Sequence, residues 1–245
     1  MPQLPRVVVL GTGPTGVAAL YGLVDGGLWA VAVDLAPATR MAGARATGSD
    51  RAAPDPSATF AERFGLLDRI RLVPGPVEVR TADPQGPFTI SGGPGSAELV
   101  ADAVVVADSH LAPDAWVADP ARLFLGMFDP AQDRVFRVDG EPPASGPPGG
   151  DDADPEIRMR IAQARGRLLG EYLRGRYLLP PRSEVAAGGP PHGARRTVAR
   201  LVDQIATRVG AGDPIPRYLR TMHRELARGH ARAGVAGYPL PCPRF

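Results

Sequence analysis

The alternation of apolar and polar positions predicts a strand, a helix and a second strand within the first 35 residues. A run of β-branched residues at 6–10 leads into a glycine-rich turn, after which small apolar residues continue at helical spacing over 17–23. A second apolar run, residues 28–33, ends at the acidic residue Asp34. Short apolar strands joined through a helix are typical of a parallel βαβ unit. The start of the chain therefore predicts an α/β fold.

The turn between the first strand and the helix has the spacing Gly-x-Gly-x-x-Gly. It consists of Gly11, Thr12, Gly13, Pro14, Thr15 and Gly16. In Rossmann-like folds the first glycine allows the tight turn, the second lets the backbone approach a pyrophosphate, and the third lets the helix pack closely. The helix N-terminus adds free N–H groups and the positive end of its dipole. We predict that these six residues bind the phosphates of a nucleotide cofactor.

Asp34 stands at the end of the second strand, about 20 residues beyond the loop, where this fingerprint expects an acid. Its carboxylate can accept a hydrogen bond from a ribose hydroxyl, which favours the free 2′-OH of FAD or NAD and disfavours the 2′-phosphate of NADP. The chain has 30 glycines, so a purely structural glycine turn is the alternative. The strand before the loop, the helix after it and the acid together favour nucleotide binding.

The apolar pattern of the next hundred residues adds strands to the same sheet. Continuous apolar runs, typical of strands buried on both faces of a parallel sheet, occupy residues 101–107 and 122–126. A helix, a strand and a hairpin are expected at residues 59–67, 70–80 and 88–100. The glycines of the hairpin turn precede no apolar helix, so the turn does not read as a second phosphate loop.

The second part of the chain is predicted to be helical. Residues 140–154 are rich in proline and glycine and have too little apolar area to order themselves, which indicates a flexible loop acting as a lid or linker. Asp154 and Pro155 begin a helix that is expected to reach about Leu179. Two further helices are expected at residues 195–209 and 214–233. We predict a dinucleotide-binding domain over residues 1–182 and a basic helical C-terminal extension over residues 183–245.

Charge is distributed unevenly along the chain. Residues 1–150 carry 11 arginines against 17 acids, and residues 151–245 carry 17 arginines against 9 acids. Nucleic acid or an acidic partner is one interpretation of the basic part. The other, which we favour, is a solvated helix face opposite the apolar stripe of Ile157, Ile161, Leu168 and Tyr172. The arginines of that face are Arg158, Arg160, Arg165, Arg167, Arg174 and Arg176.

Composition excludes several classes of protein. The chain is 44% hydrophobic, which is enough for a buried core, but it has no apolar run of about 20 residues that would span a membrane. With no leader pattern at its start, a cytoplasmic location is expected. The single cysteine, Cys242, has no partner for an internal disulfide. The four histidines are not spaced as metal ligands, so we predict no metal site and assign no catalytic residue.

In its order of segments the chain resembles the flavin-containing monooxygenases and the related Baeyer–Villiger monooxygenases. The glycine loop with Asp34 looks like their FAD fingerprint, and residues 60–70 resemble the helix and strand before their adenine-contacting turn. Residues 102–109 are similar to their Ala-Thr-Gly strand end. Residues 123–130 and 163–180 resemble the strand and the long helix that close their FAD domain.

The resemblance implies further FAD contacts. The resemblance assigns FAD contacts to Ala107 and Gly126 and places the backbone of Val77 at the adenine. Asp129 is predicted as a flavin contact because it follows an expected strand. Pro76 is the alternative to Val77 in the adenine-contacting position, but proline has no N–H to donate. Asp108 and Ser109 stand where the family has threonine and glycine.

The chain also departs from the family in a way that bears on its reaction. Between Ala107 and Arg122 there is no counterpart of the NADPH domain that the family inserts there. The resemblance thus implies an FAD-dependent oxygenation of a small nucleophilic or carbonyl substrate, with NAD(P)H, a separate reductase or a partner subunit as the external electron source. The alternatives are a non-catalytic nucleotide-binding protein that acts through its basic helices and, more weakly, an NAD-dependent dehydrogenase.

Overall fold

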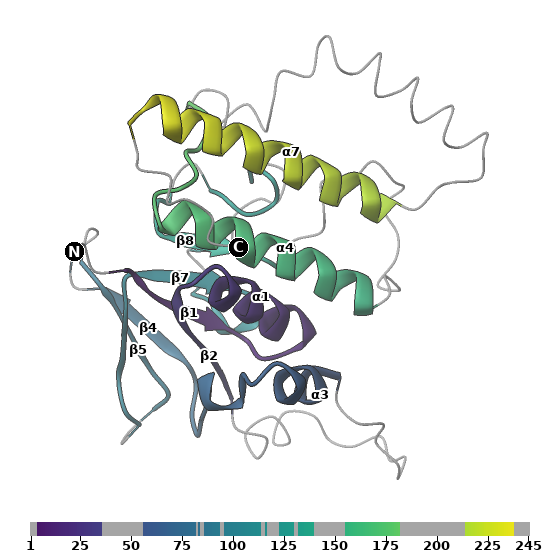
Figure 1. Ribbon diagram of the computed structural model, residues 1–245. Helices are drawn as coiled ribbons and strands as arrows, with labels where there is room; N and C mark the ends of the chain where they lie inside the picture. Colours follow the sequence, from purple (N-terminus) through teal and green to yellow (C-terminus); the bar gives the residue numbers. More distant parts are fainter. Residues whose placement is uncertain are drawn as a thin grey trace.

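A parallel sheet of five strands lies at the centre of the protein in this computed structural model (Figure 1). The structure describes residues 4–35, 56–81, 83, 86–93, 96–113, 116, 123–129, 132–139, 155–181 and 214–237. The strand order is β3-β2-β1-β7-β8, and every neighbouring pair is parallel. The strands are β1 (Arg6–Leu10), β2 (Trp29–Leu35), β3 (Ile70–Val73), β7 (Ala103–Val106) and β8 (Val135–Arg137). The predicted parallel α/β sheet is confirmed.

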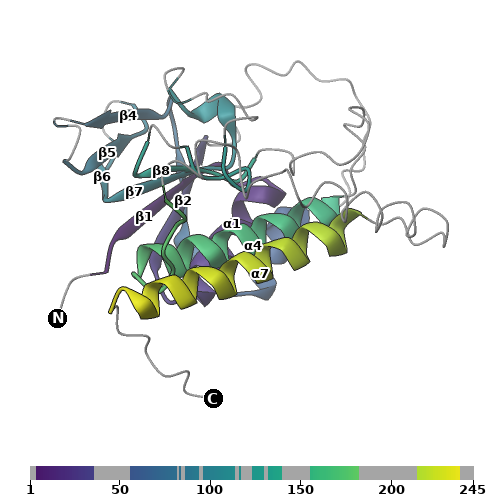
Figure 2. The same cartoon turned by 90° about the horizontal axis from the view of Figure 1, so that it is seen from above.

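Three helices cover one face of this sheet. They are α1 (Pro14–Asp25), α4 (Pro155–Leu173) and α7 (Pro214–Val235), and α4 lies between the other two (Figure 2). The shorter α3 (Pro56–Arg63) packs against α1 where the rings of Tyr21, Phe60 and Phe64 meet. Short 3₁₀ turns occupy Leu67–Arg69 and Ser109–Leu111. Among the helices that the structure describes, none is both long and apolar enough to cross a membrane.

A smaller antiparallel sheet covers the opposite face. Its strands, in order, are β4 (Glu78–Thr81), β5 (Phe88–Ser91) and β6 (Leu99–Ala101). Alternate residues of the central strands face the two layers: Val7 and Val9 pack among the helices, whereas Val8 and Leu10 pack against the second sheet. The result is the predicted three-layer, Rossmann-like arrangement, with an apolar core on each side of the parallel sheet.

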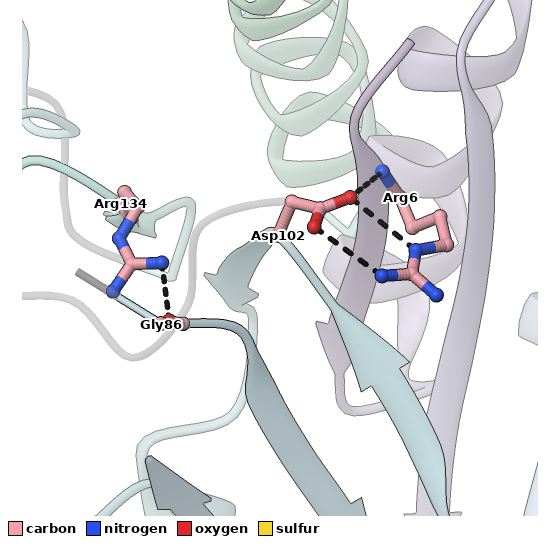
Figure 3. A network of polar contacts seen from close by, with 4 residues as sticks. All are labelled: Arg6, Gly86, Asp102 and Arg134. Atoms are coloured by element: carbon pink, nitrogen blue, oxygen red, sulfur yellow. Dashed lines mark hydrogen bonds and ion pairs between the residues drawn. The ribbon is translucent and has the colours of Figure 1, made fainter. Parts of the chain in front are cut away.

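Two arginines fasten the second sheet to the central one (Figure 3). Asp102, between β6 and β7, accepts hydrogen bonds from the backbone N–H of Arg6 at 2.8 Å and from its guanidinium. Burial opposes ionisation of Asp102, but the hydrogen bonds and charge of Arg6 outweigh it and hold the pKa of Asp102 below its ordinary value. Arg134 donates to the carbonyl oxygen of Gly86 and lies over the ring of Phe88.

Helices α1 and α4 approach each other through glycines. A Cβ added to Gly22 would lie 2.3 Å from the carbonyl oxygen of Gln163, and one added to Gly166 would lie 2.3 Å from that of Ala19. Real Cβ atoms do not come so close to backbone, so only glycine fits at either position. The expected apolar stripe describes only part of the packing of α4, because its backbone also contacts the backbone of α1 at these glycines.

Arg165 does not belong to the solvated face predicted for this helix. Its side chain is fully buried, and its Nη1 donates a hydrogen bond to the carbonyl oxygen of Val138 at 2.8 Å. A buried guanidinium needs such acceptors, because leaving water without them costs several kcal/mol. Arg158, Arg160 and Arg167 are exposed, as predicted. Arg174 and Arg176 are only half-exposed: Arg174 donates to the carbonyl oxygen of Gly26, and Arg176 pairs with Glu171.

The same helix ends earlier than its apolar pattern suggests, at Leu173 instead of about Leu179. Gly175 adopts φ +71°, and its N–H donates to the carbonyl oxygen of Tyr172 while the N–H of Arg176 donates to that of Glu171. This pair of bonds closes a helix through a left-handed glycine. Glycine therefore ends α4 before Pro180 does.

Buried polar contacts hold α7 against the body of the protein. The hydroxyl of Tyr177 donates to Glu225 at 3.3 Å, and Arg232 donates to the same carboxylate. Burial beside Glu225 raises the pKa of Tyr177, so its hydroxyl remains a donor. Gly229 leaves room for the Tyr177 ring, since an added Cβ would lie 1.9 Å from it.

Two expected strands are wrong in detail. Residues 70–80 form two strands, β3 and β4, that belong to different sheets. Within the expected strand at 122–126, the described residues 123–126 do not form a strand: Leu125 and Gly126 have φ +55° and +69°, and the chain folds back so that Phe124 bridges Phe128. The strand beside β7 is instead β8. The expected loop at 140–154 and helix at 195–209 lie outside the described residues.

Candidate nucleotide-binding site

The glycine loop connects the end of β1 to the start of α1. Gly11 adopts φ +109°, which favours glycine, and its N–H donates to the carbonyl oxygen of Val33 in β2 at 2.8 Å. A Cβ on Gly16 would lie 2.0 Å from the carbonyl oxygen of Gly11, so α1 could not start so close to the strand with any other residue. The first and third glycines thus have the tight-turn and close-packing geometry that the sequence predicts for them.

Gly13 differs from the other two because it faces open space. A Cβ added there would meet no atom of the described residues within 4 Å. Gly13 is the N-cap of α1 and forms no side-chain cap bond, Pro14 follows it in the first turn, and that turn contains no acidic residue. The positive end of the helix dipole is therefore not neutralised by the helix's own first turn, which suits it to an anionic group.

Asp34 lies beside the loop, at the carboxyl end of β2. Its Oδ2 accepts hydrogen bonds from the backbone N–H and the hydroxyl of Thr12, at 2.8 and 2.6 Å. Its Oδ1 accepts a bond from the N–H of Leu35 at 2.7 Å, and the residue is only 1% exposed. The structure thus brings Asp34 and the loop together as predicted, but the carboxylate already has donors from the protein.

Ala107 and Asp108 complete the site from the end of β7. Both residues donate a backbone hydrogen bond to the carbonyl oxygen of Leu10, at 2.9 Å. A Cβ on Gly11 would lie 2.8 Å from the Cβ of Asp108, and one on Gly16 would lie 3.4 Å from that of Ala107. The sheet order reverses between β1 and β7, and ligands of doubly wound sheets bind at the carboxyl edge of such a point. The Asp108 side chain accepts from the N–H of His110, which turns the chain away from the strand.

The other predicted contacts lie further from the loop. Val77 follows β3, and its half-buried side chain packs against the core between the two sheets, which leaves its backbone as the group available to a ligand. Gly126 and Asp129 belong to the turn beside β8, where the N–H of Arg137 donates to the carbonyl oxygen of Met127 at 3.0 Å. β7 lies between this turn and the glycine loop.

Asp139 is a candidate that the sequence analysis missed. It follows β8 by two residues at the carboxyl edge, and its carboxylate forms a two-point ion pair with Arg137, at 3.0 and 2.8 Å. Both side chains are largely buried, at 15% and 11% exposure. The available signal was three apolar residues, Val135, Phe136 and Val138, followed by an acid, which resembles the pattern that ends at Asp34.

The arrangement can hold a phosphorylated ligand, and its described residues contain no evident catalytic pair. Of the three histidines in the described residues, His110 and His223 are exposed, and His230 bonds Glu171 at 3.1 Å between α4 and α7, on the helical face of the sheet. Within the described part of the chain, no group of three or more His, Cys, Asp or Glu could hold a metal ion.

No protein-family model and no curated protein matches the chain. Among solved structures, it is similar to a flavin monooxygenase from Stenotrophomonas maltophilia, with 20% identity over 42% of this chain and 37% of that one, and a TM-score of 0.29. It is similar to Lactococcus lactis thioredoxin reductase, with 18% identity over 42% of this chain and 34% of that one, and a TM-score of 0.29. It is also similar to an oxidized steroid monooxygenase bound to NADP, with 17% identity, coverage of 49% and 29%, and a TM-score of 0.31. The chain spans between 29% and 37% of the length of these proteins.

Proposed function

We propose that this chain binds FAD at the glycine loop and is the cofactor-binding part of a flavin-dependent oxidoreductase. The observation that carries the proposal is the open space at Gly13, between the end of β1 and the N-terminus of α1. A glycine at a helix N-terminus that none of the described residues crowds is what backbone approach to a pyrophosphate requires. Within the proposal, Gly13 and the first turn of α1 hold the phosphates, while Ala107 borders them from β7.

The finer assignment is an oxygenation of a small nucleophilic or carbonyl substrate, as the resemblance to flavin monooxygenases implies. When bound, the flavin would supply the redox chemistry, and the protein would position it and limit access of water. Electrons come from outside the chain in this proposal. Only residues 107–134 separate β7 from β8 in the sheet, where the monooxygenases insert a nicotinamide-binding domain.

The first test is reconstitution of the purified chain with FAD. We expect a bound-flavin absorbance spectrum at one FAD per chain, and a chain that binds adenine nucleotides but no flavin would contradict the proposal. That second outcome would favour a non-catalytic nucleotide-binding protein acting through α7, on which the exposed Arg220 and Arg224 could meet an acidic partner.

The second test mixes the FAD-loaded chain with excess NADPH or NADH without oxygen. Hydride transfer requires the nicotinamide to be held near contact with the flavin, and this positioning lowers the barrier by several kcal/mol. We expect slow, non-saturable bleaching of the flavin absorbance, and fast bleaching only when a reductase is added. Fast, saturable bleaching by NADPH alone would show that the chain builds its own nicotinamide site.

A further inference from the structure

Asp34 and Thr12 are joined by hydrogen bonds that phosphate binding by the glycine loop does not itself require. One carboxylate oxygen, Oδ2, accepts both the backbone N–H and the hydroxyl of Thr12, at 2.8 and 2.6 Å. The other oxygen accepts the N–H of Leu35 at 2.7 Å. Hydrogen bonds to a charged acceptor are shorter and about twice as strong as neutral ones. Asp34 is therefore a strong attachment point for the loop before any ligand arrives.

This attachment fixes the loop to β2 at two consecutive residues. The N–H of Gly11 bonds the carbonyl oxygen of Val33, and the next residue along the loop, Thr12, bonds the next residue along the strand, Asp34. Gly11 has no side chain to limit its own backbone, so its neighbours must hold the turn. The next residue after Thr12 is Gly13, which faces the open space. The two bonds from Thr12 thus set where the backbone of Gly13 lies.

A ribose hydroxyl would compete with Thr12 for the same carboxylate. Both carboxylate oxygens of Asp34 already accept hydrogen bonds, Oδ2 from Thr12 and Oδ1 from Leu35. Only 1% of the residue is exposed, so a ribose hydroxyl would have to displace one of the protein's own donors, of which the Thr12 hydroxyl is the one of the same kind. Exchanging one hydroxyl donor for another gains little free energy, because the bond formed is of the same kind as the bond lost.

We propose that Asp34 is a positioning residue that clamps the glycine loop through Thr12, and that it does not select nucleotides by their ribose 2′-OH. The site then recognises a nucleotide through its phosphates and accepts 2′-hydroxy and 2′-deoxy adenine nucleotides alike. The statement about nucleotides rests on the proposed function, whereas the clamp itself does not.

The ligand experiment titrates ADP and 2′-deoxy-ADP into the wild-type chain and three variants. We expect the two dissociation constants of the wild type to agree within about threefold, since no ribose bond distinguishes the ligands. Thr12→Val and Asp34→Ala should weaken both ligands by the same factor, and Thr12→Ser, which keeps the hydroxyl, should restore wild-type affinity. A wild-type preference for ADP of about tenfold or more that disappears in Asp34→Ala would overturn the proposal.

A second experiment needs no ligand and separates the clamp from the proposed function. Thr12→Val should lower the thermal unfolding midpoint by about 3–10 °C in the wild-type background and by much less in the Asp34→Ala background. Thr89→Val, a matched change in β5, should have the same effect in both backgrounds. Additive effects of Thr12→Val and Asp34→Ala would refute the clamp. If neither nucleotide binds the wild type but the effects of Thr12→Val and Asp34→Ala on the unfolding midpoint are not additive, the proposed function fails and the clamp stands.

Discussion

A methyl group added at Gly13 would meet no atom of the described residues within 4 Å, whereas one added at Gly22 or Gly166 would lie 2.3 Å from a backbone oxygen of the neighbouring helix. The two regions use the same residue for opposite purposes. In the helix layer, glycine makes room for another part of the chain. In the loop, Gly13 leaves room that the described chain does not fill, which is the property expected of a ligand site.

The two regions also differ in how they are stabilised. The loop is held by hydrogen bonds within one βαβ unit, from Gly11 to Val33 and from Thr12 to Asp34 near the end of β2. The helix layer depends on contacts between residues more than a hundred positions apart, such as Gly22 with Gln163. Substitutions in the helix layer should therefore affect folding, and substitutions at Gly13 should affect binding alone.

The largest effect is expected from Gly166→Ala. Alanine favours helix over glycine by about 1 kcal/mol, but here its Cβ would collide with the backbone of α1 at Ala19. We expect a net loss of about 2–4 kcal/mol in the free energy of unfolding, measured by urea denaturation. Gly170→Ala, one turn further along α4, is the matched control: its Cβ would lie 3.4 Å from the nearest atom, so it should be neutral or stabilising.

The second-largest effect is expected from Arg165→Met. This change removes the buried guanidinium and its bond to the carbonyl oxygen of Val138, while the methionine still fills the space with an apolar side chain. We expect a loss of about 1.5–3 kcal/mol in the free energy of unfolding. The exposed Arg167, changed to Met, should alter it by less than about 0.5 kcal/mol. Equal effects of the two substitutions would contradict the structural role assigned to Arg165.

The smallest effect is expected from Asp102→Asn, because the Asp102 and Arg6 side chains are 42% and 43% exposed. Near neutral pH the loss should be at most about 1 kcal/mol. The folded state lowers the pKa of Asp102 below its ordinary 3.8, so the carboxylate stabilises the fold above that pH, and this contribution disappears as the pH falls further. The free energies of unfolding of wild type and variant should thus differ at pH 7 and converge in acid. A difference between them that grows in acid would contradict a lowered pKa of Asp102 in the folded state.

Much of the fold and part of the site could be predicted from the sequence because they depend on local pattern. One βαβ unit contains the apolar run 6–10, the glycine spacing and Asp34. The conformation of each follows from its own residues and does not depend on the rest of the chain. The hairpin of β5 and β6 is likewise marked by its own turn residues, and its antiparallel pairing is confirmed.

The rest of the fold and of the site could not be predicted because it depends on contacts between segments that are distant in the sequence. The run 122–126 is as apolar as a strand, but Leu125 and Gly126 turn it back, and the shorter 135–138 takes the place beside β7. Arg165 and its exposed neighbours are all arginines at similar spacing along the helix. Only the fold, which brings the carbonyl oxygen of Val138 to Arg165, shows that this one is buried. Local sequence likewise gave no sign that Thr12 would engage Asp34.

The central claim is that the open space at Gly13 is a nucleotide site, and the most direct test is a binding titration of FAD and ADP against the wild type and Gly13→Val. The valine side chain would project into that space without touching the strand or helix cores, so the unfolding midpoint should stay within about 2 °C of wild type while binding of both ligands is lost. Wild-type stoichiometry and affinity in a correctly folded Gly13→Val chain would contradict the claim and place any nucleotide elsewhere on the protein.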